Sequence, residues 1–170
     1  MDSICFEINN GKVAVVETDT VMGIISKDSQ LIYNIKKRSS RKKLIILVAS
    51  IRDVPNLTDK QTQVIEKYWP GPLTVIKNNV GYRMPNHEEL LELIGKTGPV
   101  FSSSANISGK TPIYNHREAE VIFNKWSNKM VLVEGKQLGG TASTVINIDR
   151  KKILREGPLN AKAILEQLGK

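Results

Sequence analysis

Residues 98–106 have the sequence Gly-Pro-Val-Phe-Ser-Ser-Ser-Ala-Asn, an apolar start that runs directly into small polar side chains. Val100 and Phe101 have the character of a buried strand. The hydroxyl and amide groups that follow pack poorly in a core, but they can bind phosphate, carboxylate or ribose oxygens. In open α/β sheets, ligands lie beyond the carboxyl ends of strands. The segment therefore predicts a ligand pocket at a strand end. The alternative is an ordinary turn with a helix cap.

Apolar runs and helix-capping residues alternate on both sides of this segment. Short β-branched runs predict strands at 13–16, 44–48, 73–76, 100–101, 131–133, 143–148 and 153–154. Capping residues ahead of amphipathic stretches predict helices from Asp28 past Ile35, from Thr58 to Tyr68, from Asn86 to Gly95, from Glu118 to Trp126 and from Asn160 to Leu168. This order predicts one α/β domain over residues 1–170, a twisted open sheet of mixed parallel and antiparallel strands with flanking helices.

Composition limits the class of protein. The single cysteine, Cys5, rules out a disulfide framework, and with two histidines it is too little for a recognisable zinc site. The first residues lack the basic and apolar regions of a signal peptide. The longest apolar run, residues 44–49, is much shorter than a membrane span. We therefore expect a soluble, cytoplasmic protein that does not contact a membrane.

The net charge of +8, with 18 Lys and 7 Arg, has two interpretations. It predicts a basic surface for an anion such as nucleic acid, or it reflects the lysine-rich codons of an AT-rich genome spread over solvated faces. The densest basic run, residues 36–43, is Lys-Lys-Arg-Ser-Ser-Arg-Lys-Lys. Charges at this density repel one another unless an anion lies among them. The run is therefore either a solvated turn or part of an anion site.

Further polar clusters fall where the predicted strands end. Residues 18–20 follow the first strand, Arg83 precedes a proline, a glycine and hydroxyl loop spans 139–144, and Arg155 ends the last strand. No phosphate-binding glycine loop, nucleophile elbow or paired metal-ligand motif is present, and we expect no protein-bound metal. A site made of cations, hydroxyls and one amide would act by placing anionic reactants, as in phosphoryl or nucleotidyl transfer.

Six motifs stand in the order seen in the YrdC/Sua5 family, which the chain resembles from about Val13 to Gly157. They are Thr-Asp-Thr-Val-Met-Gly at 18–23, the basic run at 36–44, Trp-Pro-Gly-Pro-Leu-Thr at 69–74, Tyr-Arg-Met-Pro-Asn-His at 82–87, Ser-Ser-Ser-Ala-Asn-Ile-Ser-Gly at 102–109 and Gly-Thr-Ala-Ser-Thr-Val at 140–145. The resemblance implies an L-threonylcarbamoyladenylate synthase, a nucleotidyltransferase that joins L-threonine, bicarbonate and ATP and releases pyrophosphate. It also implies Mg²⁺ with the nucleotide, and hand-over of the product to proteins that modify adenosine 37 of tRNA.

The resemblance also assigns roles to individual residues. The family's Lys-x-Arg and Ser-x-Asn tetrad corresponds to Lys36, Arg38, Ser104 and Asn106, expected to be catalytic and to bind ATP together with Lys42 and Arg155. The positions expected to contact L-threonine are Thr18, Arg83, Ser102 and Ser143.

The chain departs from the family pattern at several positions. Glu17, Met22 and Ser39 stand where the family usually has Pro, an aromatic residue and Pro, and little room is left for a first helix before Val13. Because strand side chains alternate between faces, Glu17 is expected to point away from Thr18.

Two other functions remain open. One is a non-catalytic module that binds RNA weakly through the same basic face, although aromatic residues, the usual platforms for bases, make up only 5% of the chain. The other is an accessory carbamoyltransferase domain of the kind found in hydrogenase-maturation proteins.

Overall fold

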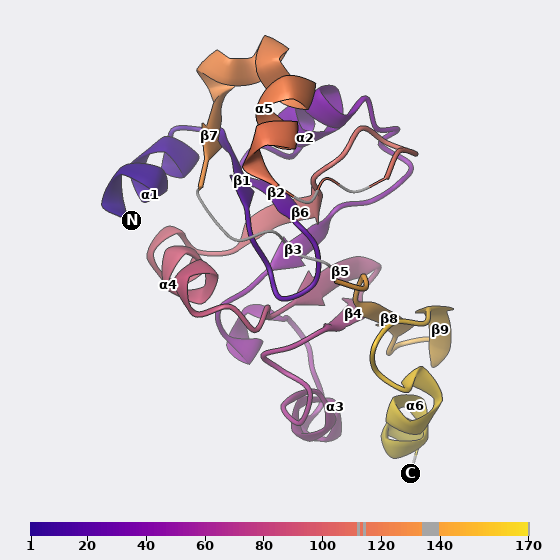
Figure 1. Cartoon of the computed structure of the whole chain (residues 1–170). Helices are drawn as coiled ribbons and strands as arrows, with labels where there is room; N and C mark the ends of the chain where they lie inside the picture. Colours follow the sequence, from indigo (N-terminus) through magenta and orange to yellow (C-terminus); the bar gives the residue numbers. More distant parts are fainter. Residues whose placement is uncertain (112, 114, 134–139, 170) are drawn as a thin grey trace.

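One mixed sheet runs through the molecule (Figure 1). The computed structural model describes residues 1–111, 113, 115–133 and 140–169, and in these residues nine strands pair in the order β7-β1-β2-β6-β3-β5-β4-β8-β9. Their bounds are β1 Val13–Val16, β2 Gly23–Ser26, β3 Ile45–Leu47, β4 Leu73–Lys77, β5 Val80–Arg83, β6 Val100–Ser104, β7 Met130–Leu132, β8 Thr144–Asn147 and β9 Lys152–Arg155. The pairs β1–β7, β3–β5 and β4–β8 are parallel and the other five are antiparallel. The predicted mixed sheet is confirmed.

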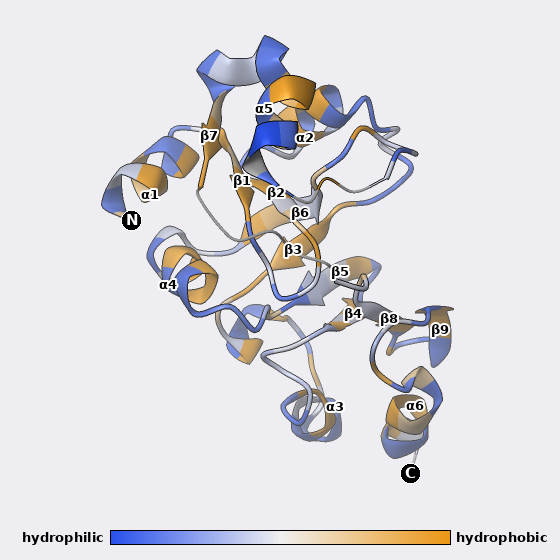
Figure 2. Ribbon diagram, in the orientation of Figure 1, coloured by the Kyte–Doolittle hydropathy of each residue, from blue (hydrophilic) through white to orange (hydrophobic). Residues whose placement is uncertain are grey.

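Helices cover the sheet in three groups, each over its own apolar cluster. The helices are α1 Asp2–Asn9, α2 Ser29–Lys36, α3 Asp59–Ile65, α4 Glu88–Thr97, α5 His116–Phe123 and α6 Ala161–Gly169, with short 3-10 turns η1 Ile51–Asp53 and η2 Asn124–Lys129. The apolar residues of α1 and α4 pack on one face of β1, β2 and β6, and those of α2 and α5 pack on the other. Those of α3 and α6 pack on β4, β5 and β8. Figure 2 shows the apolar strands inside and hydrophilic residues on the outer helices.

Three predicted helix starts are confirmed by their caps. The Asp28 carboxylate accepts a hydrogen bond from the Leu31 amide at 3.1 Å. Thr58 and Gln61 bond to each other's backbone N–H, each at 3.2 Å, and form a capping box. Asn160 accepts from the Ala163 amide at 3.0 Å. Short polar side chains ahead of apolar stretches thus predicted the starts of these three helices correctly.

The predicted bounds of three helices are wrong. α3 ends at Ile65 rather than Tyr68, because the chain passes into turns at 66–68. α4 has His87, not Asn86, at its N-cap, because the His87 Nδ1 accepts the Leu90 amide at 3.3 Å. It also continues past Gly95 to Thr97 and ends at Gly98, whose φ of +77° suits glycine.

The helix predicted from Glu118 to Trp126 is two elements. Asn115 caps α5 by accepting the Glu118 amide at 2.9 Å, and the chain tightens into η2 after Phe123.

Four elements were not predicted: α1, β2, β5 and the short turn η1. α1 occupies residues expected to have little room for a helix, and it buries Cys5 and Ile8. β2 and β5 are four-residue strands that contain or begin with glycine, which weakens a strand pattern in sequence. β3 pairs with β5 and β6, so β5 places Arg83 beside the centre of the sheet.

Candidate active site

A cavity of about 190 Å³ lies where the segment after β1, the end of β6 and the end of β5 meet. Its lining residues are Thr18, Thr20, Val21, Gly23, Arg38, Lys43, Ile45, Leu47, Arg83, Ser102, Ser103, Ser104, Ala142, Ser143 and Arg155. The structure thus brings together seven of the expected site residues: Thr18, Arg38, Arg83, Ser102, Ser104, Ser143 and Arg155. Lys36, Asn106 and Lys42 do not line it. The first two are buried beneath it, and Lys42 is exposed beside it.

Strand register brings the serines of β6 to the cavity. Ser102 pairs with Ile25 of β2 and Ile45 of β3, while Ser104 pairs with Gly23. A Cβ on Gly23 would lie 3.3 Å from Thr18 Cγ2, so the glycine leaves room for the Thr18 segment to pack over β2. Among the described residues the Ser102 hydroxyl has no hydrogen-bond partner. This hydroxyl is therefore available to a ligand.

Thr18 and Thr20 form a directed hydrogen-bond chain. The Thr18 hydroxyl donates to Val21 O at 2.7 Å, so in its 3.1 Å contact with Thr20 Oγ1 it must accept. It also accepts the Thr20 amide at 3.1 Å. The single hydrogen and both lone pairs of Thr18 are thus used inside the protein. Thr18 shapes the cavity wall, and its hydroxyl has no capacity left for a ligand.

Arg83 is almost fully buried and is held from three directions. Its Nη1 donates to Thr20 Oγ1 at 2.8 Å, its Nε donates to Gly71 O at 3.2 Å, and its Nη2 forms an ion pair with Asp19 Oδ1. Burial lowers the pKa of Arg83, and the Asp19 carboxylate opposes that shift. The other oxygen of Asp19, Oδ2, is buried without a hydrogen-bond partner in the described structure. Asp19 therefore fixes the guanidinium and neutralises part of its charge.

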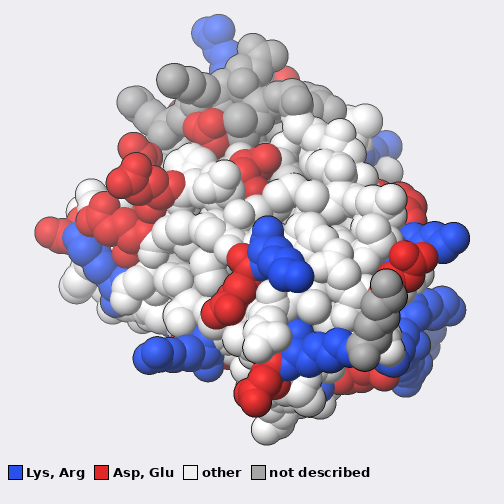
Figure 3. Space-filling view, turned by 90° about the horizontal axis from the view of Figure 1, so that it is seen from below, with Lys and Arg blue, Asp and Glu red and all other residues white. Residues whose placement is uncertain are grey.

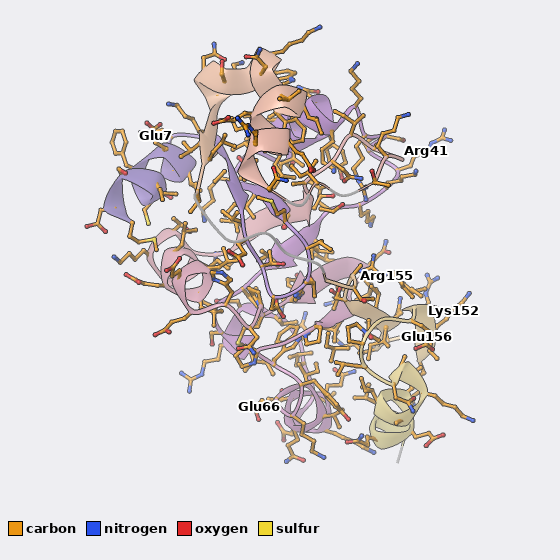
Figure 4. The ribbon with its side chains drawn as sticks, viewed as in Figure 1. Glu7, Arg41, Glu66, Lys152, Arg155 and Glu156 are labelled. Atoms are coloured by element: carbon orange, nitrogen blue, oxygen red, sulfur yellow. The ribbon has the colours of Figure 1, made fainter. Side chains whose placement is uncertain are left out.

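Arg155 reaches the cavity from β9. Its Nε donates to Ser143 O at 2.9 Å and its Nη2 to Ser143 Oγ at 3.1 Å. Ser143 Oγ also lies 2.8 Å from Thr74 Oγ1. The Arg155 Nη1 has no partner among the described residues. Figure 4 labels Arg155 at the sheet end beside β8.

Lys36 lies beneath Ser104 with no exposed surface. Its ammonium donates to Ser104 O, to Asn106 O at 2.6 Å and to Asn106 Oδ1 at 2.8 Å. Ser104 Oγ donates to the same Oδ1 at 2.8 Å, and Asn106 Nδ2 donates to Lys110 O. Burial, helped by the charge of Arg38, lowers the pKa of Lys36 to about 7. In this structure Lys36 and Asn106 therefore position Ser104.

Arg38 shapes the basic segment that borders the cavity. Its Nε donates to Lys42 O at 2.8 Å and its Nη2 to Lys43 O at 3.1 Å, so one guanidinium folds the segment around itself. None of the five ion pairs found in the described residues involves Arg38, Lys43 or Arg155. Asp19 is thus the one carboxylate paired with a cavity cation in this part of the chain, and the cavity favours an anionic ligand.

Other cavity residues were not assigned from sequence. Thr20 and Asp19 stood in the quoted Thr-Asp-Thr motif, but their link to Arg83 spans 63 and 64 positions, which a local pattern does not reveal. A Cβ on Gly140 would lie 1.6 Å from Thr20 O, so only glycine allows this loop to cross the Thr20 segment. Gly139, quoted with the same loop, lies outside the described residues.

The expectation for Glu17 is confirmed. Glu17 lines a separate small cavity with Ile4, His87 and Leu90, beside α1 and α4, whereas Thr18 lines the main cavity. Glu17 and Thr18 thus border different cavities.

The sequence and the fold place the chain in a known class of protein. The chain belongs to the Sua5/YciO/YrdC family, because the model of that family, described as telomere recombination, matches residues 7–157.

Similar proteins extend the comparison. A putative threonylcarbamoyl-AMP synthase of Methanocaldococcus jannaschii is 32% identical to this chain. The match covers 89% of this chain and 82% of the relative's length. An uncharacterized protein of Mycoplasma genitalium is 33% identical over 85% of this chain, which spans only 32% of that protein. The crystal structure of P. abyssi Sua5 complexed with L-threonine superposes with a TM-score of 0.82 at 27% identity, and covers 98% of this chain and 56% of its own.

The described residues offer neither a metal-ligand cluster nor a membrane-spanning helix. No three His, Cys, Asp or Glu side chains gather where they could hold a metal ion. None of the helices in these residues is both long enough and apolar enough to cross a membrane.

Proposed function

We propose that this protein is an L-threonylcarbamoyladenylate synthase, which joins L-threonine, bicarbonate and ATP and releases pyrophosphate. The observation that carries the proposal is a cavity with three guanidinium groups, Arg38, Arg83 and Arg155, of which Arg83 alone is paired with a carboxylate in the described structure. The printed names of relatives and the L-threonine in the P. abyssi structure support the same activity.

L-Threonine is proposed to bind at the end of the cavity bounded by Arg83, Ser102 and Ser143. A guanidinium is suited to the amino acid carboxylate, and the unpartnered Ser102 hydroxyl can bond to the substrate hydroxyl. Thr18 contributes part of the cavity wall and keeps its hydroxyl bonded to Val21 and Thr20.

ATP is proposed to place its α-phosphate between Arg38, Arg155 and Ser104, with Lys42 at the outer rim. The amine of threonine first adds to bicarbonate with loss of water, which gives a carbamate. A carbamate oxygen then attacks the α-phosphorus, and the bond to pyrophosphate breaks. Arg38 and Arg155 stabilise the negative charge that accumulates on the phosphoryl oxygens. The protein supplies no nucleophile in this reaction. It therefore accelerates the reaction by positioning the reactants and by stabilising the charge that develops on them.

Mg²⁺ belongs to this proposal as part of the nucleotide substrate, held by phosphate oxygens, because the described residues gather no metal-ligand set. The product is proposed to pass to proteins that transfer the threonylcarbamoyl group to adenosine 37 of tRNA, as already expected from the resemblance.

A pyrophosphate-release assay tests the proposal. The protein is incubated with ATP and magnesium, and L-threonine and bicarbonate are omitted in turn. The proposal expects release that saturates with L-threonine and requires both omitted reactants. Release that is indifferent to threonine, or none at all, would contradict it. A non-catalytic RNA-binding module would give no pyrophosphate and only salt-sensitive binding to RNA.

A further inference from the structure

Another pocket of about 190 Å³ lies beside β3, and we call it the Tyr33 pocket. Its apolar lining consists of Tyr33 of α2, Leu44 just before β3, Ile46 of β3, Val80 of β5 and Phe101 of β6. None of these five side chains lines the active-site cavity. The Tyr33 pocket is therefore built largely from residues to which the proposed synthesis gives no role.

The alternation of strand side chains separates this pocket from the active-site cavity. Ile45 and Leu47 of β3 line the active-site cavity, whereas Ile46 between them lines the Tyr33 pocket. In β6, Ser102 lines the active-site cavity and Phe101 lines the Tyr33 pocket. Because successive side chains of a strand point to opposite faces, the two sites lie on opposite faces of the sheet.

The Tyr33 pocket lies where two groups of helices meet over the sheet. Tyr33 and Phe101 pack against the apolar cluster beneath α2 and α5. Ile46 and Val80 pack against the cluster beneath α3 and α6, and Ile46 pairs with Phe101 across β3 and β6. All four side chains are only half-buried. In Figure 1, α2 lies above and α3 lies below the strands β3 and β5. The apolar surface between the two helix groups is thus left open to a ligand.

Polar groups complete the lining of the pocket. Lys43 Nζ donates to Asn79 O at 3.1 Å and takes part in no ion pair within the described residues. Two of its three hydrogens thus stay available. The hydroxyls of Ser29 and Tyr33 have no hydrogen-bond partner in the described part of the chain. The pocket therefore offers one ammonium and two hydroxyls to a ligand.

The β4–β5 turn holds the lysine in place. Asn78 and Asn79 have φ values of +48° and +64°, as in the two-residue hairpin turns in which asparagine is favoured. This turn presents Asn79 O to the Lys43 ammonium. The cation is thus positioned at the pocket before any ligand binds.

The charge around the pocket favours an anion. No carboxylate is found among the lining residues. Figure 3 shows Lys and Arg gathered towards the right and lower edges of its view, while Asp and Glu gather more on the left. Figure 4 labels Arg41, two residues before Lys43, on the right-hand side of the molecule. A positive surface of this kind raises the local concentration of an anionic ligand.

Size and lining limit the body of the ligand. Pockets for drug-sized ligands have volumes of about 300–1,000 Å³, so a pocket of about 190 Å³ takes a smaller molecule. Two aromatic side chains, Tyr33 and Phe101, are among the eight residues of the lining. Aromatic rings prefer offset-stacked or edge-to-face contacts with another ring. A single aromatic ring therefore suits this space.

We propose that the Tyr33 pocket binds a small aromatic carboxylate. Its ring packs against Tyr33 and Phe101, and its carboxylate accepts hydrogen bonds from Lys43 and from the hydroxyls of Ser29 and Tyr33. This inference goes beyond the proposed synthase and does not depend on it, because the site uses none of the residues assigned to L-threonine or ATP.

Titration of the ¹⁵N-labelled whole protein, followed by ¹H–¹⁵N NMR, tests the inference with benzoate as the probe. The backbone amides of Ile46, Val80 and Phe101 are expected to shift in a saturable way. Acetate has the charge without the ring, and benzyl alcohol has the ring without the charge. Each should bind at least about tenfold more weakly than benzoate, because each lacks one of the two kinds of contact.

Two variants and a matched control locate the site. Ser29→Glu places a carboxylate in the pocket and should weaken benzoate binding about tenfold. It is compatible with folding, because residue 29 begins α2, where a negative charge is favourable and the first turn has none. Tyr33→Ala should weaken binding about fivefold. Gln30→Glu adds the same charge at an exposed neighbouring residue outside the lining and should change the affinity less than about twofold.

Several results would overturn the inference. Shifts confined to Thr18, Arg83 and Ser143 would assign benzoate to the active-site cavity, and no saturable shift would leave the pocket without this ligand. Equal affinities for benzoate and benzyl alcohol would show that the pocket does not recognise the anion, and equal affinities for benzoate and acetate would show that it does not recognise the ring. Wild-type affinity in Ser29→Glu, or an equal loss in Gln30→Glu, would also contradict the assignment.

Discussion

The ammonium of Lys36 lies 2.8 Å from Oδ1 of Asn106 and has no exposed surface. Two members of the expected catalytic tetrad thus bond to each other beneath the cavity, and the same Oδ1 holds the Ser104 hydroxyl. The tetrad divides into two parts: Arg38 and Ser104 line the cavity, and Lys36 and Asn106 hold Ser104 from beneath.

We predict that Lys36→Met lowers kcat more than it raises the KM for L-threonine. The substitution removes the ammonium from Ser104 O, Asn106 O and Asn106 Oδ1, of which Oδ1 keeps the Ser104 hydroxyl as a donor. It should therefore also lower the free energy of unfolding by about 1–3 kcal/mol. Steady-state kinetics and urea denaturation measure the two effects. Wild-type kcat in a folded variant would show that Ser104 does not depend on this lysine.

The pKa of Lys36 gives a pH dependence with a defined sign. Because burial lowers this pKa from 10.5 to about 7, the unfolded chain binds a proton between these values that the folded chain has released. This contribution makes stability rise with pH over that window and makes it flat below pH 7. Urea denaturation from pH 6 to about pH 9 should therefore show a steeper rise for the wild type than for Lys36→Met. Parallel curves would contradict the assignment.

Asn106→Asp is expected to move the alkaline limb of activity to higher pH. Above pH 7 the neutral Lys36 amine has one hydrogen fewer than its three acceptors require, so Ser104 loses support. A carboxylate at position 106 keeps the acceptor and raises the pKa of Lys36. The pH profile of kcat/KM measures the shift. A limb that moves to lower pH, or does not move, would refute the link between Lys36 and activity.

Arg38→Ala should reduce kcat/KM by about 30- to 1,000-fold, because a charge-assisted contact to the phosphoryl group is worth about 2–4 kcal/mol in the transition state. Arg38→Lys should also fail, since a point charge cannot bond to both Lys42 O and Lys43 O and still face the ligand. Arg52→Ala, at an exposed arginine on η1, is the control. Wild-type turnover by the Arg38→Ala variant would show that Arg38 does not take part in the reaction.

The threonine site should reject valine by about 100-fold or more in kcat/KM, because a site built for a hydroxyl leaves polar groups unpaired around an apolar isostere. Ser102→Ala should reduce the preference for threonine over valine, since the Ser102 hydroxyl lines the cavity and has no hydrogen-bond partner among the described residues. Competition assays with the two amino acids measure the ratio. Glu17→Gln serves as the control and should change the threonine KM less than about threefold, because Glu17 faces the other cavity.

Local patterns predicted much of the fold and part of the site. The caps at Asp28, Thr58 and Asn160 act within three residues of themselves, which a sequence window contains. β5 could not be recognised in this way, because its place depends on pairing with β3 across 36 positions, as in Ile45 with Gly81.

The orientation of site residues was the least predictable property. Lys36 and Asn106 stand 70 positions apart, and nothing in the sequence distinguishes a lysine that faces phosphate from one that supports a loop. The Thr18 hydroxyl is a similar case, since its commitment to Val21 depends on the turn geometry of the folded segment. The types of side chain in the sequence indicated the chemistry of the site. Only the folded structure distinguishes the side chains that line the cavity from those that hold other residues in place.

Radiolabelled bicarbonate that is followed into product shows whether the protein is a threonylcarbamoyladenylate synthase. The purified protein is incubated with ATP, magnesium, L-threonine and labelled bicarbonate, and the nucleotides are separated by chromatography. We expect label in an adenylate that releases AMP on hydrolysis, in amounts equal to the pyrophosphate formed, and only when L-threonine is present. Pyrophosphate formed without label in any adenylate, or label incorporated without threonine, would contradict the account.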